Sequence, residues 1–457
     1  MKILLINPPV DGIEETVVIP MGLAYIASVL MNHHEIKVVD LRAYPKYDIA
    51  DEILEADAVG ITATILSARS CKKLLRFFKE KKPGIVTIIG GSYPTAIPER
   101  VLSNKDVDII VLGEGENTAV ELFDVLEKGD DLSKVNGIGY RENGNTCFTP
   151  PRELISDIDS LPYPAHELFP LELYTGFNPA FKGFGRTGSI LTSRGCPYNC
   201  IYCFKKTFGN KWRCRSPESI VKEWAYQIEK LNVKQMAIID DCFNLDIERA
   251  VTIFSEVVAN KVNIPWLAPV GMRADRFTQE LLDKMKQSGC FRISIGVENG
   301  NQEYLNKVVK KHFDFSKAKE TVSYCRKIGI ETAAFYILGL PQENKKTMQQ
   351  TINFAKELDT DYAQFLIANP FPGTEFFDIV QREGKILRDV EDYSGHADNR
   401  ANFEMGELDE ELLVKMRKKA YWSFYMRPKM ITKKMLSDPT NLIRGGYYLL
   451  KRMVTGA

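Results

Sequence analysis

Two series of short aliphatic segments, separated by stretches long enough for helices, constrain the fold of this chain most strongly. The first series falls at residues 2–6, 36–39, 58–61, 86–89 and 109–111. Strands that alternate with helix-length stretches form parallel sheets with helices on both faces. The first series therefore predicts a doubly wound α/β domain, whose ligand site lies at the carboxyl ends of its strands.

A second series of strand-like segments begins near residue 189. Its members fall at 190–192, 235–239, 266–270, 292–295, 333–337 and 362–367. This spacing predicts a partial parallel β/α barrel, in which the chemistry sits at the carboxyl ends of the strands. Polar or glycine-containing segments follow five successive strands, which indicates one shared site. These segments contain Cys196, Asp240, Arg273, Glu298 and Gly339.

Three cysteines follow the first strand of the second series. Cys196, Cys200 and Cys203 have the spacing C-x3-C-x2-C, and no fourth cysteine lies at a matching short interval. Three thiolates on a [4Fe-4S] cluster leave one iron open to bind a substrate or cofactor. A structural zinc site with Cys214 as fourth ligand is the alternative, but zinc ligands favour closely spaced pairs that this segment lacks. The spacing therefore favours the cluster.

The other cysteines and the apolar runs bear on the location of the protein. Six further cysteines are scattered singly over 457 residues, which is too sparse for a disulfide framework. No segment reaches the roughly 20 apolar residues of a membrane-spanning helix, and the apolar run at the amino terminus stops at Pro8. We therefore expect a reduced, cytoplasmic setting.

The cysteine segment resembles the motif of the radical S-adenosylmethionine (radical SAM) enzymes. Arg194-Gly195 precedes Cys196, and an aromatic residue precedes the last cysteine. The resemblance implies that the open iron holds the amino and carboxylate groups of SAM, which one electron cleaves to a 5′-deoxyadenosyl radical. It also implies an electron donor of the flavodoxin or ferredoxin type. By charge and motif position, the expected SAM-binding residues are Tyr202, Asp240, Asp241, Arg273, Glu298, Asn299, Gly339 and Pro341.

Some of these assignments have structural alternatives. The acids would accept hydrogen bonds from the SAM ammonium and ribose, and Arg273 would donate to its carboxylate. An ion pair at the barrel rim is the alternative for Arg273 and Glu298. A helix N-cap would explain Asp240 and Asp241.

Glycines and small polar residues lie at the predicted strand ends of the first series. Glycine permits a close approach that a β-carbon would block, so these loops suit a large ligand, although each alone could be a turn. With Pro8-Pro9 and residues 20–25, they resemble the Rossmann-like cobalamin-binding domain that precedes the radical SAM domain in one large family. The resemblance implies these cobalamin-binding residues: Pro9, Thr62, Ala63, Thr64, Ile65, Gly90, Gly91, Ser92, Tyr93, Glu114, Gly115 and Glu116.

One motif of cobalamin-binding domains is missing. No D-x-H-x-x-G follows the first strand, so no histidine is available there as a lower cobalt ligand. The family often lacks this histidine, which implies that cobalamin binds with its base off and that Thr62 to Ile65 face the cobalt. His33 and His34 end a predicted helix, and we expect both to be solvated.

The remaining composition divides the chain into four parts. A proline-rich, acidic stretch at 150–164 is typical of an extended linker. The expected parts are a cobalamin-binding domain (1–145), a linker (146–184), a radical SAM barrel (185–375) and a mostly helical basic domain (376–457).

The segment from Lys415 to Ala457 is locally cationic. It has 11 Lys or Arg and a single acidic residue, although the whole chain has 60 basic and 60 acidic residues. Interleaved aromatic residues favour contact with an anionic membrane surface or a lipid-like substrate. A helical cap with a solvated basic face is the alternative, and nucleic-acid binding is less favoured.

The two modules together predict radical methylation of an unactivated carbon. In the family that the chain resembles, the deoxyadenosyl radical removes a hydrogen, and the carbon radical takes a methyl group from methylcobalamin. Cyclisation or rearrangement without net methyl transfer is the alternative within that family. A cobalamin or redox sensor with an iron–sulfur cluster is an alternative of another class, but a sensor has no need of an open iron.

Overall fold

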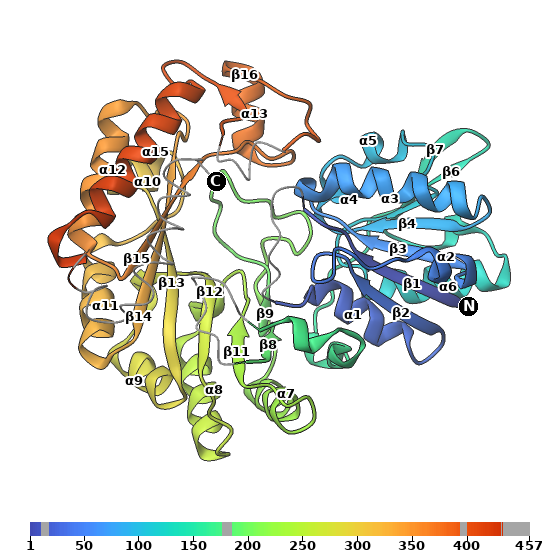
Figure 1. Ribbon diagram of the computed structural model, residues 1–457, viewed down its shortest axis with the longest axis horizontal. Helices are drawn as coiled ribbons and strands as arrows, with labels where there is room; N and C mark the ends of the chain where they lie inside the picture. The colour runs from blue at the N-terminus through green and yellow to red at the C-terminus, as the bar shows by residue number, and fades with distance from the viewer. Residues whose placement is uncertain (11–17, 176–184, 394–399, 431, 433–457) are drawn as a thin grey trace. The chain divides into compact units, whose positions relative to one another are not determined.

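The computed structural model describes residues 1–10, 18–175, 185–393, 400–430 and 432. The chain divides into two compact units. Unit 1 comprises Met1–Pro197 and Phe204–Met236, and unit 2 comprises Tyr198–Cys203 and Ala237–Ala457. Figure 1 shows the helices and strands with the labels used below.

A seven-stranded sheet with the order β2-β1-β3-β4-β5-β6-β7 forms the centre of unit 1. Strands β1 to β5 are parallel, which confirms the predicted doubly wound sheet. The antiparallel strands β6 and β7 extend its edge. The strands are β1 (Lys2–Asn7), β2 (Glu35–Asp40), β3 (Ala58–Thr62), β4 (Val86–Gly90), β5 (Ile109–Val111), β6 (Ile138–Glu142) and β7 (Asn145–Phe148).

The hairpin β6–β7 was not among the predicted strands. Its turn consists of Asn143 and Gly144, whose φ angles are 49° and 82°. A tight two-residue hairpin turn of this kind requires positive φ at both positions, and Asn-Gly is a preferred pair for it. The sequence therefore contained a local signal for this hairpin. Strand β7 also crosses the predicted domain boundary between residues 145 and 146.

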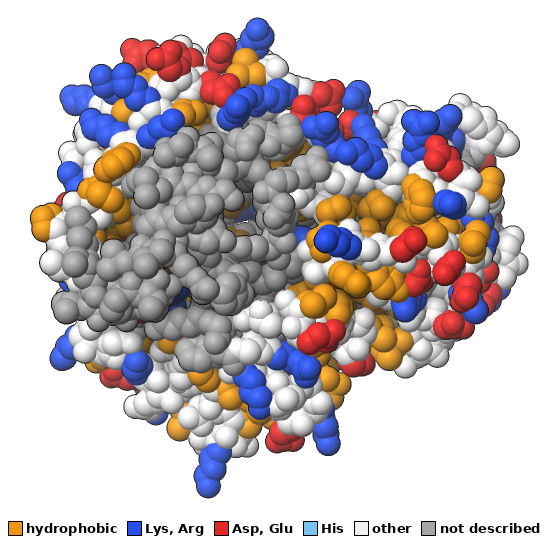
Figure 2. Space-filling view, viewed as in Figure 1, with side chains coloured by type: hydrophobic (Ala, Val, Ile, Leu, Met, Phe, Trp, Pro, Cys, Tyr) orange, Lys and Arg blue, Asp and Glu red, His pale blue; other side chains and the backbone are white. Residues whose placement is uncertain are grey.

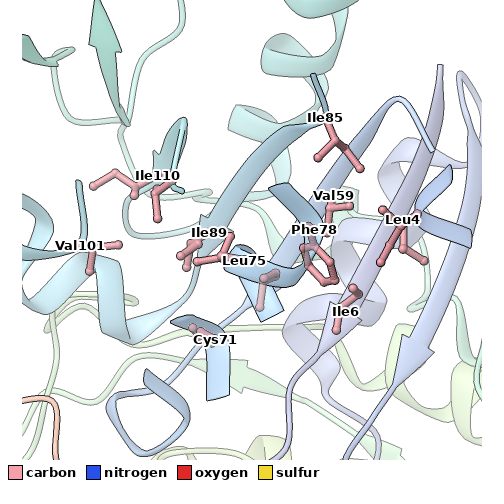
Figure 3. Close-up of a cluster of buried hydrophobic side chains, with 14 of the residues drawn as sticks. Leu4, Ile6, Val59, Cys71, Leu75, Phe78, Ile85, Ile89, Val101 and Ile110 are labelled. Carbon is pink, nitrogen blue, oxygen red and sulfur yellow. The ribbon is translucent and has the colours of Figure 1, made fainter. Parts of the chain in front are cut away.

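The two faces of this sheet differ because successive strand residues point to opposite sides. One face packs against α2 (Ala50–Glu55), α3 (Ala68–Lys81) and α5 (Pro98–Leu102), and Figure 3 shows the buried side chains there. The other face lies under α1 (Met21–Leu30) and α6 (Glu116–Lys128) (Figure 1). The strands present Leu5, Gly60, Ile88 and Val111 to that second face.

Unit 1 also contains further short strands and a helix that follow this sheet in the sequence. They are β8 (Thr187–Ile190), β9 (Ser193–Arg194), β10 (Arg213–Cys214) and α7 (Pro217–Glu229). The predicted strand at 190–192 was wrong in its bounds, because β8 ends at Ile190 and the chain then pairs Ser193 and Arg194 antiparallel with β10. The three motif cysteines lie in the loop between β9 and β10.

The second parallel sheet has the order β15-β14-β13-β12-β11-β8, which confirms the predicted partial β/α barrel. Helices connect its successive strands, as expected for a parallel arrangement. Its further strands are β11 (Gln235–Ile238), β12 (Trp266–Met272), β13 (Cys290–Glu298), β14 (Glu331–Leu338) and β15 (Tyr362–Ile367). The helices are α8 (Ile247–Ala259), α9 (Gln279–Gln287), α10 (Gln302–Lys307), α11 (Phe315–Ile328) and α12 (Lys345–Leu358).

The chain continues with α13 (Glu375–Glu383), a small hairpin of β16 (Lys385–Ile386) and β17 (Phe403–Glu404), and α15 (Glu410–Tyr425). Helix α15 packs on β15: Tyr421 accepts a hydrogen bond from the Phe365 amide at 3.3 Å, and Tyr425 accepts one from Ala363 at 3.0 Å. This part of the basic segment therefore forms a helical cap. Residues 431 and 433–457 of that segment lie outside the described residues.

Charged side chains of both signs are interspersed over the described part of the face in Figure 2, in keeping with the zero net charge of the chain. In the described part of the chain, no helix has the length and apolar character needed to cross a membrane.

Replacement of Trp266 by alanine should strongly destabilise unit 2. The Trp266 and Phe254 rings are fully buried and stack at 4.7 Å between β12 and α8. We expect a loss of about 3–5 kcal/mol in the free energy of unfolding, measured by chemical denaturation, because the large cavity cannot collapse fully. Trp422→Ala is the control because that side chain is 52% exposed, and equal losses in the two variants would contradict the prediction.

Candidate functional site

A buried network of ions lies at the base of the cysteine loop in unit 1. Arg194 of β9 stands directly opposite Arg213 of β10. Glu114 accepts from both, at 3.0 Å from Arg194 Nη1 and 2.8 Å from Arg213 Nη1. Arg194 also donates to Glu116 at 2.6 Å. All four side chains are buried, so two positive and two negative charges compensate one another inside the protein.

Gly195 connects Arg194 to Cys196. Its φ is +79°, and an added Cβ would lie 2.5 Å from the Lys211 carbonyl oxygen. Arg213 binds the same stretch, because its Nη2 donates to the Phe208 carbonyl at 3.1 Å. Only glycine allows this contact between the two ends of the cysteine loop.

A cavity of about 140 Å³ lies within unit 1, on the sheet face covered by α1 and α6. Its wall is mostly apolar and contains several glycines. At Gly60 an added Cβ would lie 2.8 Å from Leu5, and at Gly115 it would lie 3.0 Å from Ile26. The cysteine segment also contributes to the wall, with Leu191, Arg194, Thr207 and Phe208.

The structure brings together the predicted cobalamin loops. The Ala63 amide donates to the Gly90 carbonyl at 2.8 Å, and the Tyr93 amide donates to the Ala63 carbonyl at 3.0 Å. The predicted residues in the cavity wall are Thr62, Gly90, Gly91, Glu114, Gly115 and Glu116. The predicted residues outside that wall are Pro9, Ala63, Thr64, Ile65, Ser92 and Tyr93, of which Ala63 and Tyr93 are buried in the core.

The two histidines of this unit differ from each other. His33 is exposed, as expected. His34 is buried instead, with Nδ1 3.4 Å from the amino-terminal nitrogen and its ring beside Phe123. Burial and the neighbouring ammonium lower the pKa of His34. The expectation of a solvated His34 was therefore wrong, because the helix end packs against the chain terminus.

Two of the motif cysteines belong to unit 2, and Cys196 belongs to unit 1. The backbone between Cys200 and Cys203 is held from two sides: Ile201 donates to Val309 at 3.2 Å and accepts from Phe376 at 2.9 Å. The hydrogen bond that the Cys203 thiol makes to the Cys200 side chain raises the pKa of Cys203. Among the described residues, no three His, Cys, Asp or Glu side chains are grouped so as to hold one metal ion.

Glu298 ends β13 in a strained conformation. Its φ is +67°, and the pairing with β14 shifts register between Gly296 and Glu298. The carboxylate lies 2.7 Å from Lys311 Nζ, with both side chains buried. Burial and the nearby Glu298 carboxylate, which is hydrogen-bonded to Tyr202, raise the pKa of Tyr202. Lys311 was not among the predicted site residues, because it follows no strand directly.

Arg273 follows β12 and is held by several acceptors. Its Nη1 donates to the Lys311 carbonyl at 2.8 Å, and Nη2 donates to the His312 carbonyl and Asp275. The guanidinium also lies 3.9 Å from the centre of the Tyr198 ring. Arg273 thus fixes the loop that carries Lys311. Both Arg273 and Glu298 form ion pairs, as the alternative expected, but not with each other: Arg273 pairs with Asp275 and Glu298 pairs with Lys311.

The two aspartates after β11 do not cap the following helix. Asp246 is the N-cap of α8 and accepts from the Arg249 amide at 3.0 Å. Asp240 is buried and Asp241 is exposed. Asn244 joins this strand end to the next, because its Nδ2 donates to the Arg273 carbonyl at 2.8 Å. The N-cap alternative for Asp240 and Asp241 is therefore wrong.

Glu343, which was not among the predicted site residues, joins two other predicted SAM-binding segments. It accepts from the Gly339 amide at 2.8 Å and from Asn299 Nδ2 at 2.8 Å. Pro341 lies between Gly339 and Glu343 in the sequence, and its carbonyl accepts a hydrogen bond from the Tyr304 hydroxyl at 2.6 Å. Burial raises the pKa of Glu343 to about 7. The sequence signal that could have identified Glu343 is its position four residues after Gly339, the glycine that follows β14.

Comparison with known proteins places these features in a family. Residues 190–355 match the Radical SAM superfamily, and residues 15–123 match the B12 binding domain. An uncharacterized methyltransferase of Pyrococcus horikoshii is 32% identical over 100% of this chain and 98% of its own. The chain belongs to the B12-binding radical SAM family.

Two further proteins that are similar to this chain extend the comparison. The cytidylyl-2-hydroxyethylphosphonate methyltransferase of Streptomyces wedmorensis is 27% identical, over 84% of this chain and 82% of its own. The structure of the radical SAM methyltransferase TsrM from Kitasatospora setae, with cobalamin and a [4Fe-4S] cluster bound, has a TM-score of 0.74. The match covers 92% of this chain and 90% of that chain at 19% identity. The TM-score over this coverage shows that the two proteins share a fold.

The free energy of unfolding should depend on pH through Glu343. Its pKa is raised from 4.5 to about 7 in the folded protein, so the folded state binds this proton more tightly than the unfolded state. The resulting stability is full below the unfolded pKa and is lost as the pH rises through about 7, a total of about 3 kcal/mol.

Chemical denaturation between pH 4.5 and about 7 should show that the free energy of unfolding of the wild type falls as the pH rises. This fall is the slope attributed to Glu343. Glu343→Gln should remove it, because an amide does not titrate. Glu357→Gln, at an exposed position of α12, should keep it. An unchanged slope in the Glu343→Gln variant would show that another group is responsible.

Proposed function

We propose that this protein is a cobalamin-dependent radical SAM methyltransferase that acts on an unactivated carbon. One observation carries the proposal: Arg194, two residues before Cys196, lines the same cavity as the glycine loops of the B12-binding domain. The strand that leads into the cysteine motif and the glycine-lined cavity are thus parts of one compact unit. Proximity of two cofactors removes much of the entropic barrier to group transfer.

The residues present fit both cofactors. Cys196, Cys200 and Cys203 would ligate the cluster, since thiolates suit iron–sulfur sites. The apolar, glycine-lined cavity suits the flat base of a base-off cobalamin, and Thr62 to Ile65 would face the cobalt. When bound, the cluster supplies the electron that cleaves SAM and the cobalamin supplies a transferable methyl group.

Residues of unit 2 would hold SAM in distinct roles. Asp240 and Asp241 would accept from its ammonium group, and Glu298 and Asn299 from its ribose. The backbone of Tyr202 would approach the adenine, and the strand end at Gly339 and Pro341 would also contact SAM. Arg273 would act by holding the Lys311 loop, because its guanidinium is already engaged by protein acceptors.

We also propose the partners and organisation expected from the sequence. Radical SAM enzymes need an electron donor, and here we propose one of flavodoxin or ferredoxin type in the cytoplasm. The proposed domain bounds remain 1–145, 185–375 and 376–457, with the linker at 146–184. The basic segment at the carboxyl end would bring a lipid-like substrate or an anionic membrane surface to the enzyme.

The products of SAM test the reaction. After anaerobic reconstitution with iron, sulfide, cobalamin and a strong reductant, the wild type should form 5′-deoxyadenosine and S-adenosylhomocysteine, measured by mass spectrometry. Cys200→Ala should lose the deoxyadenosine, because the cluster loses a ligand. Cys214→Ala is the matched control, since this exposed cysteine lies on β10 outside the motif.

Each other outcome contradicts part of the proposal. Deoxyadenosine without S-adenosylhomocysteine would indicate cyclisation or rearrangement without net methyl transfer. If the wild type forms neither product, the result would contradict an enzymatic function and favour the sensor. Tightly bound zinc that is lost equally in Cys200→Ala and Cys214→Ala would favour the structural zinc site.

Vesicle binding tests the membrane partner. The full chain should co-sediment with anionic phosphatidylglycerol vesicles, and not with neutral phosphatidylcholine vesicles, because clustered Lys and Arg are attracted to anionic lipid. Replacement of Lys433 and Lys434 by glutamine should weaken this binding. The same change at Lys345 and Lys346, which are exposed on α12, should not. Equal effects would attribute binding to general surface charge.

A further inference from the structure

We infer that Glu114, a residue of the B12-binding domain, positions the cluster-binding loop of the radical SAM domain. It lies 80 residues before Arg194 in sequence and touches none of the motif cysteines in the described contacts. It acts through the two strands that carry the loop. The inference rests on the proposed function, because it assumes that the three cysteines hold an iron–sulfur cluster.

Two like charges lie at the base of the cysteine loop. Arg194 and Arg213 face each other across the β9–β10 pair, and both side chains are buried. Like charges directly opposite in an antiparallel pair are destabilising, and burial strengthens their repulsion because the local dielectric is low. By themselves, these two residues would push the ends of the cysteine loop apart.

Glu114 reverses this repulsion by bridging the two strands. Its Oε1 lies 3.0 Å from Arg194 and its Oε2 lies 2.8 Å from Arg213. Oε2 also accepts from the Ile155 amide at 2.8 Å, which fixes the carboxylate in place. A single carboxylate therefore joins both ends of the loop that contains Cys196, Cys200 and Cys203.

Glu116 completes the balance of charge but not the bridge. It pairs only with Arg194 in the contacts described, at 2.6 Å. With both glutamates, the two arginines are neutralised inside the protein. Loss of Glu114 leaves one uncompensated positive charge between the strands, whereas loss of Glu114 together with Arg213 leaves the balanced pair Arg194–Glu116.

The charge balance predicts a rescue that a general packing role would not produce. Glu114→Gln should reduce iron uptake on anaerobic reconstitution and alter the electron paramagnetic resonance spectrum of the reduced cluster. The double variant Glu114→Gln/Arg213→Gln should recover much of the wild-type iron content and spectrum, because it removes the buried excess charge. Far-UV circular dichroism of each apoprotein tests whether the variant is folded.

A second buried network in unit 1 supplies a matched control. Glu223 is fully buried and binds Arg215 and His166, the latter at 3.0 Å. It lies on α7 and neither bridges β9 to β10 nor lines the cavity. Glu223→Gln should lower the thermal unfolding temperature but retain the cluster and its spectrum.

The outcomes separate this inference from the proposed function. A folded Glu114→Gln variant with wild-type iron content and spectrum would overturn the inference. A double variant no better than Glu114→Gln, or Glu223→Gln losing its cluster to the same extent, would also overturn it. A wild type that binds the cluster but forms no deoxyadenosine would contradict the proposed function alone, and the comparison of variants would still decide the role of Glu114.

Discussion

The carboxylate of Glu114, bound between two buried arginines, is the interaction on which the cysteine loop depends. It compensates the repulsion between Arg194 and Arg213 and so lets β9 and β10 pair. Breaking such a buried pair by removing one partner typically costs about 3–5 kcal/mol, because the remaining charge is uncompensated. The B12-binding domain therefore contributes to the loop of the radical SAM domain as well as to its own cavity.

The strand ends of unit 2 follow the same physical rule. Two buried charges there form ion pairs: Glu298 binds Lys311 and Arg273 binds Asp275. Among the described residues, Glu343 has no ion-pair partner and instead accepts amide hydrogen bonds, so burial dominates and raises its pKa to about 7. These contacts hold the loops in register. The left-handed conformation of Glu298 shows that this arrangement overrides local backbone preference.

Periodicity predicted most of the regular structure. The aliphatic runs anticipated β1 to β5 and the barrel strands because strand burial and side-chain alternation are local properties. The bounds of β8 were missed because the pairing of Ser193 with Cys214 involves residues remote in sequence. His34 was expected in solvent, yet it packs against the amino terminus and Phe123. A helix pattern does not show which distant group will cover its end.

The sequence by itself determined the two α/β modules, the cysteine motif and the family, because residue spacing and local pattern carry that information. Only the tertiary structure decided the partners of the charged residues. Glu114 and Glu116 were expected at the cofactor and lie in the cavity wall, but their carboxylates bind Arg194 and Arg213. A buried ion pairs with the charged group that the fold brings next to it, and a buried charge without a partner would carry a large desolvation cost.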